Sequence, residues 1–321
     1  MQAAVSNFVP VADELHRLRT GRSVEARFFQ AVAKQNPKHP GHQGVFLATP
    51  SGKLLASATC KDSNAMLKLL DRGRIAWQAL PAEARGAKAS DWVGDQKSVR
   101  AEDAYPDRGL VLRVTSRDLP RESLLGSRAR RWHRYFLWFD RAEARSMLPA
   151  RLEQGQRISV PPGLARRLAS LALVDKGRVD GFTKPFRDRD VVRADWSFEV
   201  VEVTDSRVSV RIGGATETRT RDAQPFVASF PKHEKLPSVR GVRTRIIGSA
   251  VWDRRRELFT SFEMVAAGNR FGGAFVGRGP GDWDEAPIGF SLRQAGSSAA
   301  ERVAPEYPDR YPWIVSRLRS R

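Results

Sequence analysis

Apolar and polar residues alternate over several long stretches in the second part of the chain, which is the pattern of half-buried β-strands. In the run WSFEVVEV, Phe198 and Val200 share one face, and after the short turn TDS, Val208 and Val210 do so in the run RVSVRIGG. Comparable runs are GLVLRVTSRDL, YFLWFD, RTRIIGSAVW, LFTSFEMVAAG and IGFSLRQ. Long strands joined by short polar turns predict an antiparallel β-rich domain over residues 106–321, built as a curved sheet, a half-barrel or a sandwich.

Two segments between these strands have the helical period instead. Residues 141–148 are the first, and residues 162–174 are the second. The second begins with proline near its first turn and carries Leu164, Leu168 and Leu171 on one stripe. The β-rich domain is therefore expected to contain a few helices.

The first residues of the chain have a mixed pattern. The run FVPV at residues 8–11 has the length of a buried strand, although Pro10 favours an edge position or a strand end. Ser23 is placed to cap a helix that ends before Asn36 and Pro37. The pattern predicts a strand followed by helical segments.

A hairpin and a long helix follow. The run QGVFLATPSGKLLAS holds two apolar segments of strand length joined by Pro50, Ser51 and Gly52, which predicts a β-hairpin over residues 44–58. Residues 62–80 then show a single apolar stripe, which predicts an amphipathic helix that packs on the hairpin. The stripe consists of Met66, Leu69, Leu70, Gly73, Trp77 and Leu80.

Residues 82–105 are rich in alanine, glycine and charge and show no sustained period, so they are interpreted as a linker. The predicted fold class is α+β, with a first segment at residues 1–81, the linker, and the antiparallel β-rich domain at residues 106–321.

The order of FVPV strand, helical segment, QGVFLATPSGKLLAS hairpin and final amphipathic helix resembles the second half of a thioredoxin-like domain. In that family, a motif similar to FVPVADE follows the helix that carries the redox C-x-x-C, and two antiparallel strands precede the last helix. The resemblance covers roughly residues 7–80. The whole chain is also similar to a group of uncharacterised bacterial proteins with a thioredoxin-like start and a β-rich remainder, and that likeness implies no activity.

The chain departs from the thioredoxin-like pattern at the redox centre. The first strand and the redox helix would lie upstream of Met1, and the family's cis-proline has no clear counterpart, because Pro40 precedes Val45 by several residues. Cys60, the single cysteine, follows the second hairpin strand, where the family has no catalytic residue. One thiol excludes an intramolecular disulfide, a C-x-x-C pair and a cysteine-based zinc site. If the fold is thioredoxin-like, the resemblance implies either a non-redox relative or a redox protein truncated at its start.

The chain has a large excess of basic residues. Lysine and arginine total 55 against 36 aspartate and glutamate residues, a net charge of +19, which attracts polyanions. The arginines stand in short groups without a recognition motif, so a solvated surface and a nonspecific nucleic-acid face both remain open. The groups are Arg128, Arg130, Arg131 and Arg134; Arg187, Arg189 and Arg193; and Arg254, Arg255 and Arg256.

Few residues suggest a metal or ligand site. His39 and His42 in NPKHPGHQG are close enough to share a metal, but no cysteine or acid lies in the same loop, so an exposed loop is the simpler interpretation and no metal or other cofactor is predicted. Trp132, His133 and Tyr135 begin an aromatic strand, where they are interpreted either as packing residues or as a surface for a ligand or partner.

A glycine-rich stretch, NRFGGAFVGRGPGDWDEAPIG, lies between two predicted strands. It does not contain G-x-G-x-x-G, and a long surface loop is the simpler interpretation. Its Asp282, Trp283 and Asp284 place carboxylates beside an aromatic ring, a combination found in calcium and sugar sites, although the acids lack the spacing of an EF-hand.

Three functional hypotheses follow. The first is a non-catalytic binding or structural protein whose β domain presents a concave sheet to an unknown protein or small ligand. The second is a thioredoxin-like redox protein whose C-x-x-C helix lies upstream of Met1. The third is weak, salt-dependent nucleic-acid binding, with Trp132, Tyr135 and Trp138 as stacking residues.

We favour binding over catalysis, because no nucleophile, metal or phosphate motif is present. The absence of a membrane span or secretion signal predicts a cytoplasmic protein as written, and a secreted or periplasmic one if the true start lies upstream.

Overall fold

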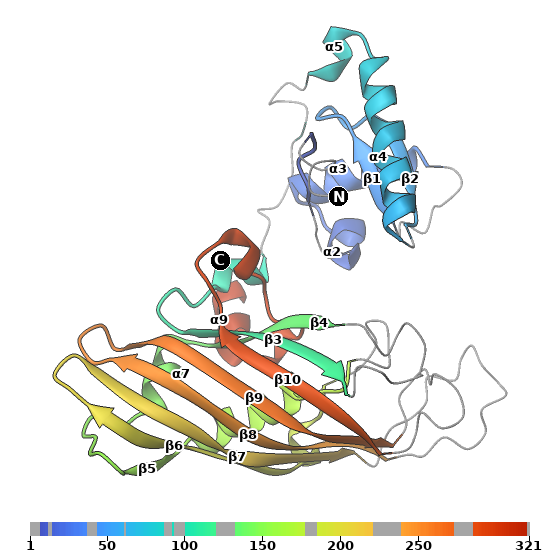
Figure 1. Ribbon diagram of the computed structural model, residues 1–321. Helices are drawn as coiled ribbons and strands as arrows, with labels where there is room; N and C mark the ends of the chain where they lie inside the picture. Colours follow the sequence, from blue (N-terminus) through green and yellow to red (C-terminus); the bar gives the residue numbers. More distant parts are fainter. Residues whose placement is uncertain are drawn as a thin grey trace. The chain divides into compact units, whose positions relative to one another are not determined.

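The computed structural model describes residues 7–11, 15–36, 44–60, 62–86, 92, 100–119, 132–176, 185–220, 239–272 and 285–319. The chain divides into two compact units, Met1–Val99 and Arg100–Arg321. Helices and antiparallel strands occur in both, in agreement with the predicted α+β class (Figure 1). Among the described residues, no helix is long and apolar enough to cross a membrane.

The first unit is built on a two-stranded hairpin. Strands β1 (Val45–Ala48) and β2 (Leu54–Ala58) pair antiparallel, and the turn between them contains Gly52 at φ +82°, a conformation that suits glycine. Helix α4 (Ser63–Gln78) packs on the hairpin, with Leu69 and Leu70 against Leu47. The Asp62 carboxylate accepts the Ala65 N–H at 2.8 Å and so begins α4.

The described part of this unit also contains α2 (Leu15–Thr20), α3 (Val24–Lys34), which Ser23 caps, and α5 (Ala82–Arg85). The prediction of a strand at residues 8–11 is wrong, because these residues have no strand structure and Val9 and Val11 are 90% and 82% exposed. Pro10 lacks the N–H that a paired strand needs, which is consistent with this result.

Residues 82–105, interpreted from the sequence as a linker, contain ordered elements. Helix α5 begins this range, and the Trp92 ring packs edge-on against Phe28, with its indole N–H donating to the Pro50 carbonyl at 3.1 Å. A short 3-10 turn, η2 (Ala101–Ala104), belongs to the second unit.

The second unit is dominated by an eight-stranded antiparallel sheet with the order β4-β3-β10-β9-β8-β7-β6-β5 (Figure 1). Its strands are β3 (Leu110–Asp118), β4 (His133–Phe139), β5 (Arg157–Ser159), β6 (Val191–Val203), β7 (Arg207–Thr220), β8 (Arg240–Asp253), β9 (Leu258–Gly272) and β10 (Ala286–Gln294). Consecutive strands from β5 to β10 are neighbours, and β10 then pairs with β3.

The sheet curves around a helical segment. Helices α7 (Arg141–Ser146), α8 (Pro162–Arg167) and the π-helical η3 (Leu168–Ala172) follow β4, and η3 contacts β4 at one edge as well as β6 and β7 near the other. One short helix reaches both sides only if the sheet wraps around it. The concave face is therefore filled by core side chains, which modifies the hypothesis that this face is presented to a partner.

Glycines allow this curvature in the central strands. A Cβ on Gly214 would lie 2.2 Å from the Asp195 carbonyl oxygen, and one on Gly268 would lie 2.0 Å from the Arg243 carbonyl oxygen. Both contacts are with backbone of the neighbouring strand, so a side chain at either position would push two strands apart.

The C-terminal segment packs against β4 and η2. It contains η6 (Ala299–Glu301), η7 (Pro308–Arg310) and α9 (Pro312–Arg319). The Trp313 ring stacks on Trp138 of β4 at 6.2 Å between centroids, and Tyr105 packs edge-on against the same Trp138 ring. This contact secures the end of the chain to an edge strand of the sheet.

Candidate functional site

The interior of the second unit is polar at one end of the sheet and apolar toward the other end. One end of the sheet is called the polar end. It is the end at which β3, β7 and β9 finish and at which β4, β6, β8 and β10 start. Its buried side chains include Asp118, Thr216, Thr218, Thr244 and Arg270. The interior toward the opposite end is aromatic, with Phe198, Trp252, Phe259 and Phe262. The charged side chains that are almost fully buried, Arg270 and Asp118 among them, therefore lie at one end.

Arg270 is the most deeply buried charge at the polar end, with 1% of its side chain exposed. Its Nε donates to Asp118 Oδ1 at 3.2 Å and lies 3.8 Å from Asp175 Oδ2. The three residues come from β9, from the end of β3 and from the segment after η3. A buried guanidinium between two carboxylates fastens these elements to one another.

Lys176 is the residue after Asp175 in the sequence, and it forms a second buried ionic contact. Its side chain is 8% exposed, and its Nζ donates to Glu306 Oε2 and, at 3.5 Å, to the Tyr307 hydroxyl. Nζ also lies over two aromatic rings, 4.8 Å from the Tyr135 centroid and 5.0 Å from the Tyr307 centroid. The ammonium group is thus enclosed by two tyrosines and one carboxylate, which we call the Lys176 cage.

The second oxygen of the same carboxylate is also held. The Tyr307 hydroxyl donates to Glu306 Oε1 at 3.2 Å, so both carboxylate oxygens accept a hydrogen bond. Tyr135 donates its own hydroxyl proton to the Ala172 carbonyl at 2.5 Å. The cage is therefore a set of directed donors around one carboxylate, and Tyr135 forms a fixed wall.

Burial shifts the titration of these groups. Desolvation lowers the pKa of Lys176 below its ordinary value, and the Glu306 carboxylate opposes that shift through its hydrogen bond and charge. Desolvation raises the pKa of Tyr135 and of Tyr307 above their ordinary values, and the charge of Glu306 adds to both shifts. The phenols consequently stay protonated and able to donate over the whole neutral range.

Residues predicted from the sequence fall into two groups. Trp132, His133 and Tyr135 lie at the polar end, where the Trp132 side chain is exposed, His133 is half-buried and Tyr135 is buried in the cage. The Arg117 guanidinium lies 4.6 Å from the Trp132 ring centroid. The other candidates, His39, His42, Asp282, Trp283 and Asp284, lie outside the described residues.

Sequence reasoning missed Asp118, Asp175, Lys176, Arg270 and Glu306. A usable signal existed for two of them. In β9, Phe262, Met264 and Ala266 face inward with a period of two, and Arg270 has the same phase, while Asp118 continues the inward phase of β3. A charged residue in the inward phase of a strand indicates a buried polar site.

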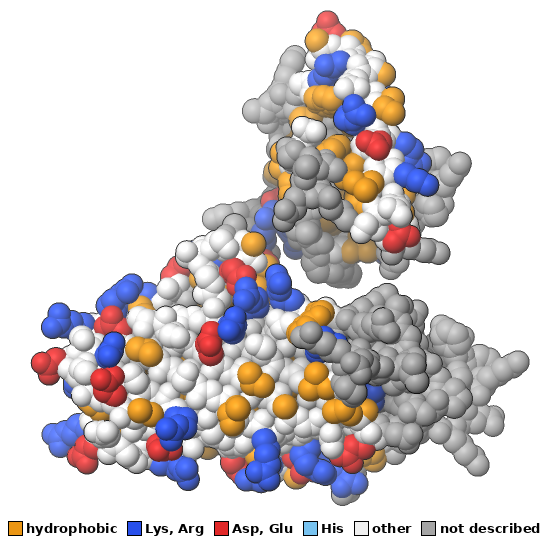
Figure 2. Space-filling model, viewed as in Figure 1, with side chains coloured by type: hydrophobic (Ala, Val, Ile, Leu, Met, Phe, Trp, Pro, Cys, Tyr) orange, Lys and Arg blue, Asp and Glu red, His pale blue; other side chains and the backbone are white. Residues whose placement is uncertain are grey.

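The outer face of the sheet carries matched charges. Three cross-strand pairs on it are Arg211 with Glu199, Arg243 with Glu217 and Arg293 with Glu263. Ile247 and Val265, direct partners on β8 and β9, are 69% and 48% exposed. In the view of Figure 2, the middle of the second unit shows mainly white and orange surface, and blue and red side chains lie mostly along its rim.

These pairs bear on the nucleic-acid hypothesis. Arginines that face carboxylates on the next strand contribute less to a positive field than their number indicates. Two of the three proposed stacking residues, Tyr135 and Trp138, are buried, at 7% and 0% exposure, and Trp132 is 56% exposed. Nucleic-acid binding therefore stays a prediction that depends on residues beyond these pairs.

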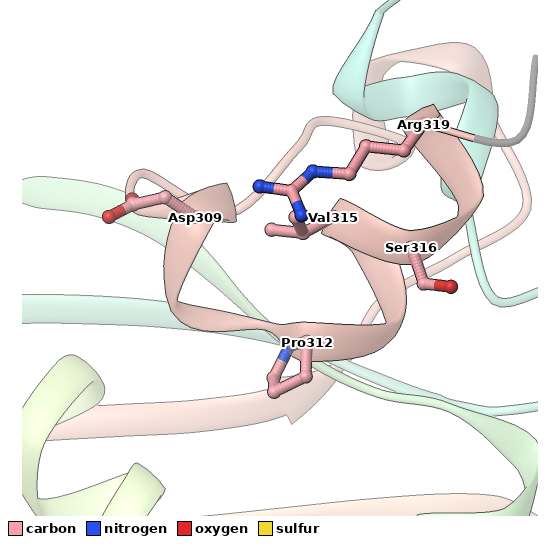
Figure 3. Close-up of a pocket in the computed structure, with 5 residues that line it drawn as sticks. All are labelled: Asp309, Pro312, Val315, Ser316 and Arg319. Carbon is pink, nitrogen blue, oxygen red and sulfur yellow. The ribbon is translucent and has the colours of Figure 1, made fainter.

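A surface hollow lies on the C-terminal segment. It has a volume of about 630 Å³ and is lined by Asp309, Pro312, Val315, Ser316 and Arg319 of η7 and α9 (Figure 3). It borders the segment that carries Glu306 and Tyr307, and the Asp309 carboxylate contributes to the raised pKa of Tyr307. The hollow is largely open to solvent, whereas the Lys176 side chain is 8% exposed.

Comparison with known proteins gives no relative for this chain: no family model, no curated protein and no solved structure matches it. Among the described residues, no group of three or more histidine, cysteine, aspartate and glutamate side chains is placed to hold a metal ion. The function of the site is therefore argued from the chemistry of the polar end.

Proposed function

We propose that this protein is a non-catalytic binding protein and that its second unit holds a small ligand at the polar end. The observation that carries the proposal is the Lys176 cage, in which an ammonium group 8% exposed is held by the carboxylate of Glu306, itself 35% exposed. One side of the contact belongs to the packed interior, and the other belongs to a coil segment that reaches solvent. Such an arrangement suits a site that opens toward solvent.

Stability alone does not require this arrangement. Removing an ammonium and a carboxylate from water costs several kcal/mol per ion, and apolar side chains of similar volume often replace a buried ion pair without loss of stability. Two aromatic walls and one directed cation are instead the composition of a small-molecule site, which is mostly apolar with a few placed polar groups.

The first unit is assigned a docking role in the same proposal, as a thioredoxin-like module without redox chemistry. Its one thiol, Cys60, is half-buried, and its sulfur lies 4.0 Å from the Ala58 carbonyl oxygen. Ligand binding in the second unit is accordingly expected to survive Cys60→Ser.

Native mass spectrometry tests the proposal. Protein purified under native conditions is expected to carry a small molecule that is released on denaturation, and Lys176→Met is expected to lack it. Lys53→Met, which removes an exposed lysine in the first unit, is the control and should retain the ligand. A wild-type protein without bound ligand, or a Lys176→Met variant that still carries it, would contradict the proposal.

A further inference from the structure

We infer that the ligand of the polar end is an organic carboxylate, and that Glu306 occupies the place of the ligand's carboxylate when no ligand is bound. This inference rests on the proposed function and specifies its ligand. It follows from how the Glu306 carboxylate is held and from where the side chain comes.

The Glu306 carboxylate is held by the donors that a ligand carboxylate would need. Lys176 Nζ donates to one oxygen and the Tyr307 hydroxyl donates to the other, at 3.2 Å. A charged donor on one oxygen and a neutral donor on the other satisfy both ends of a carboxylate, which has acceptor sites only. A ligand carboxylate in this position would form the same two bonds.

The position of Glu306 also allows its side chain to rotate away from Lys176. It lies in the coil between η6 and η7, as its neighbour Tyr307 does, and its side chain is 35% exposed. Lys176, by contrast, is 8% exposed and follows Asp175, which is 3.8 Å from the buried Arg270 guanidinium. Rotation of the Glu306 side chain into water would therefore leave a fixed cation facing the site.

The surroundings specify the rest of the ligand. The rings of Tyr135 and Tyr307 flank the ammonium, and the Phe186 ring lies 4.4 Å from the Arg240 guanidinium. The charge of Arg240 acts on both Lys176 and Tyr307. Aromatic walls favour a ligand with an apolar or aromatic body, and the two cations favour a single anionic group at its end.

Competition by Glu306 has a measurable consequence. When an internal group occupies a site, the apparent association constant of a ligand equals its intrinsic value multiplied by the fraction of molecules in which the site is open. Glu306→Gln removes the competing charge but keeps the size of the side chain. If the site is open in about one molecule in ten, this variant would bind a carboxylate about tenfold more tightly than the wild type.

The test is a calorimetric titration with benzoate, and with inorganic phosphate as the alternative anion. Glu306→Gln should bind benzoate about tenfold more tightly than the wild type, and Lys176→Met should lose binding. Glu301→Gln is the matched control, because Glu301 lies five residues upstream and pairs with Arg113 at 2.7 Å. It should match the wild type.

The outcomes separate the two claims. Benzoate binding that Glu306→Gln leaves unchanged, or a preference for phosphate, would overturn the carboxylate inference even if Lys176→Met loses the natural ligand. Natural ligand retained by Lys176→Met would overturn the proposed function itself. Circular dichroism shows whether Lys176→Met is folded, and Glu306→Gln keeps the inference testable if it is not, because that variant leaves the lysine in place.

Discussion

Replacing Arg270 by methionine should destabilise the second unit strongly. The substitution keeps the unbranched stem of the side chain but leaves Asp118 and Asp175, whose side chains are 5% and 7% exposed, without the guanidinium between them. Removing one partner from a buried ionic contact costs about 3–5 kcal/mol, because the remaining charge is buried without compensation. A domain has a total stability of only about 5–15 kcal/mol, so this is a large fraction.

Urea unfolding followed by tryptophan fluorescence measures the effect. With a denaturant slope of about 3 kcal/mol per molar urea, a loss of 3–5 kcal/mol lowers the unfolding midpoint by about 1–1.7 M. Arg211→Met is the matched control, since the Arg211 side chain is 64% exposed and pairs with Glu199 on the outer face. Surface pairs of this kind contribute about 0–1 kcal/mol, so the control midpoint should move by less than about 0.4 M.

A double variant examines the cause. Adding Asp118→Asn to Arg270→Met removes one of the two carboxylate charges that faced the guanidinium, so part of the lost stability should return. The reasoning would be refuted if Arg270→Met cost no more than Arg211→Met, because the buried carboxylates would then not depend on the guanidinium.

Three further predictions concern other parts of the chain. Gly214→Ala should lower the free energy of unfolding of the second unit by about 1–3 kcal/mol in urea unfolding. Gly213→Ala, whose Cβ meets no atom within 4 Å, should be neutral or slightly stabilising. Equal effects of the two substitutions would refute the curvature argument. Asp62→Ala should cost the first unit about 1 kcal/mol through loss of the α4 cap, with Asp71→Ala, an exposed residue of the same helix, as the near-neutral control in thermal unfolding. Above pH about 10.5 the free energy of unfolding should fall by up to about 1.4 kcal/mol per pH unit for each tyrosine with a raised pKa, because the unfolded chain loses these protons first. Tyr135→Phe should reduce that slope. Tyrosinate absorbance of the folded protein below pH about 10.5 would contradict the prediction. The tyrosines are Tyr135, Tyr307 and Tyr311.

The sign of the alkaline effect depends on opposite contributions. A tyrosine whose pKa is raised on folding keeps its proton in the folded state longer than in the unfolded state, so stability is lost as the pH rises above the unfolded pKa. Lys176, whose pKa is lowered, acts in the other direction, and stability rises with pH until the unfolded lysine has also lost its proton. Above pH about 11.5, one unit beyond the unfolded lysine pKa of about 10.4, the lysine contribution is nearly constant and the tyrosines decide the slope.

The sequence predicted most of the large sheet because its signal is local. Alternation over 9–15 residues marks β6 to β10 directly, and the turns between β6 and β7 and between β8 and β9 are short and polar. Strand β5 was missed because its three residues, Arg157–Ser159, are too few to show a period. The strand predicted at residues 8–11 was wrong because two exposed valines beside a proline give the composition of a strand without its pairing.

The site was less accessible to such reasoning. Trp132, His133 and Tyr135 lie at the same end of β4 as the proposed site, but Lys176 and Glu306 are separated by 130 residues and local sequence patterns do not indicate their contact. The thioredoxin-like interpretation of the first unit stays a prediction, since a hairpin with one packed helix occurs in many folds.

The pairing of β3 with β10 has a consequence for synthesis. Of the strands of the large sheet, β3 and β4 leave the ribosome first, and they carry Leu110, Leu112, Leu137 and Trp138, all buried in the finished sheet. Their place beside β10 does not exist until roughly 150 more residues have been added, on the order of ten seconds at about 5–20 residues per second. During that interval a nascent apolar hairpin is exposed in the cell, so this stretch is where a chaperone would most benefit the growing chain.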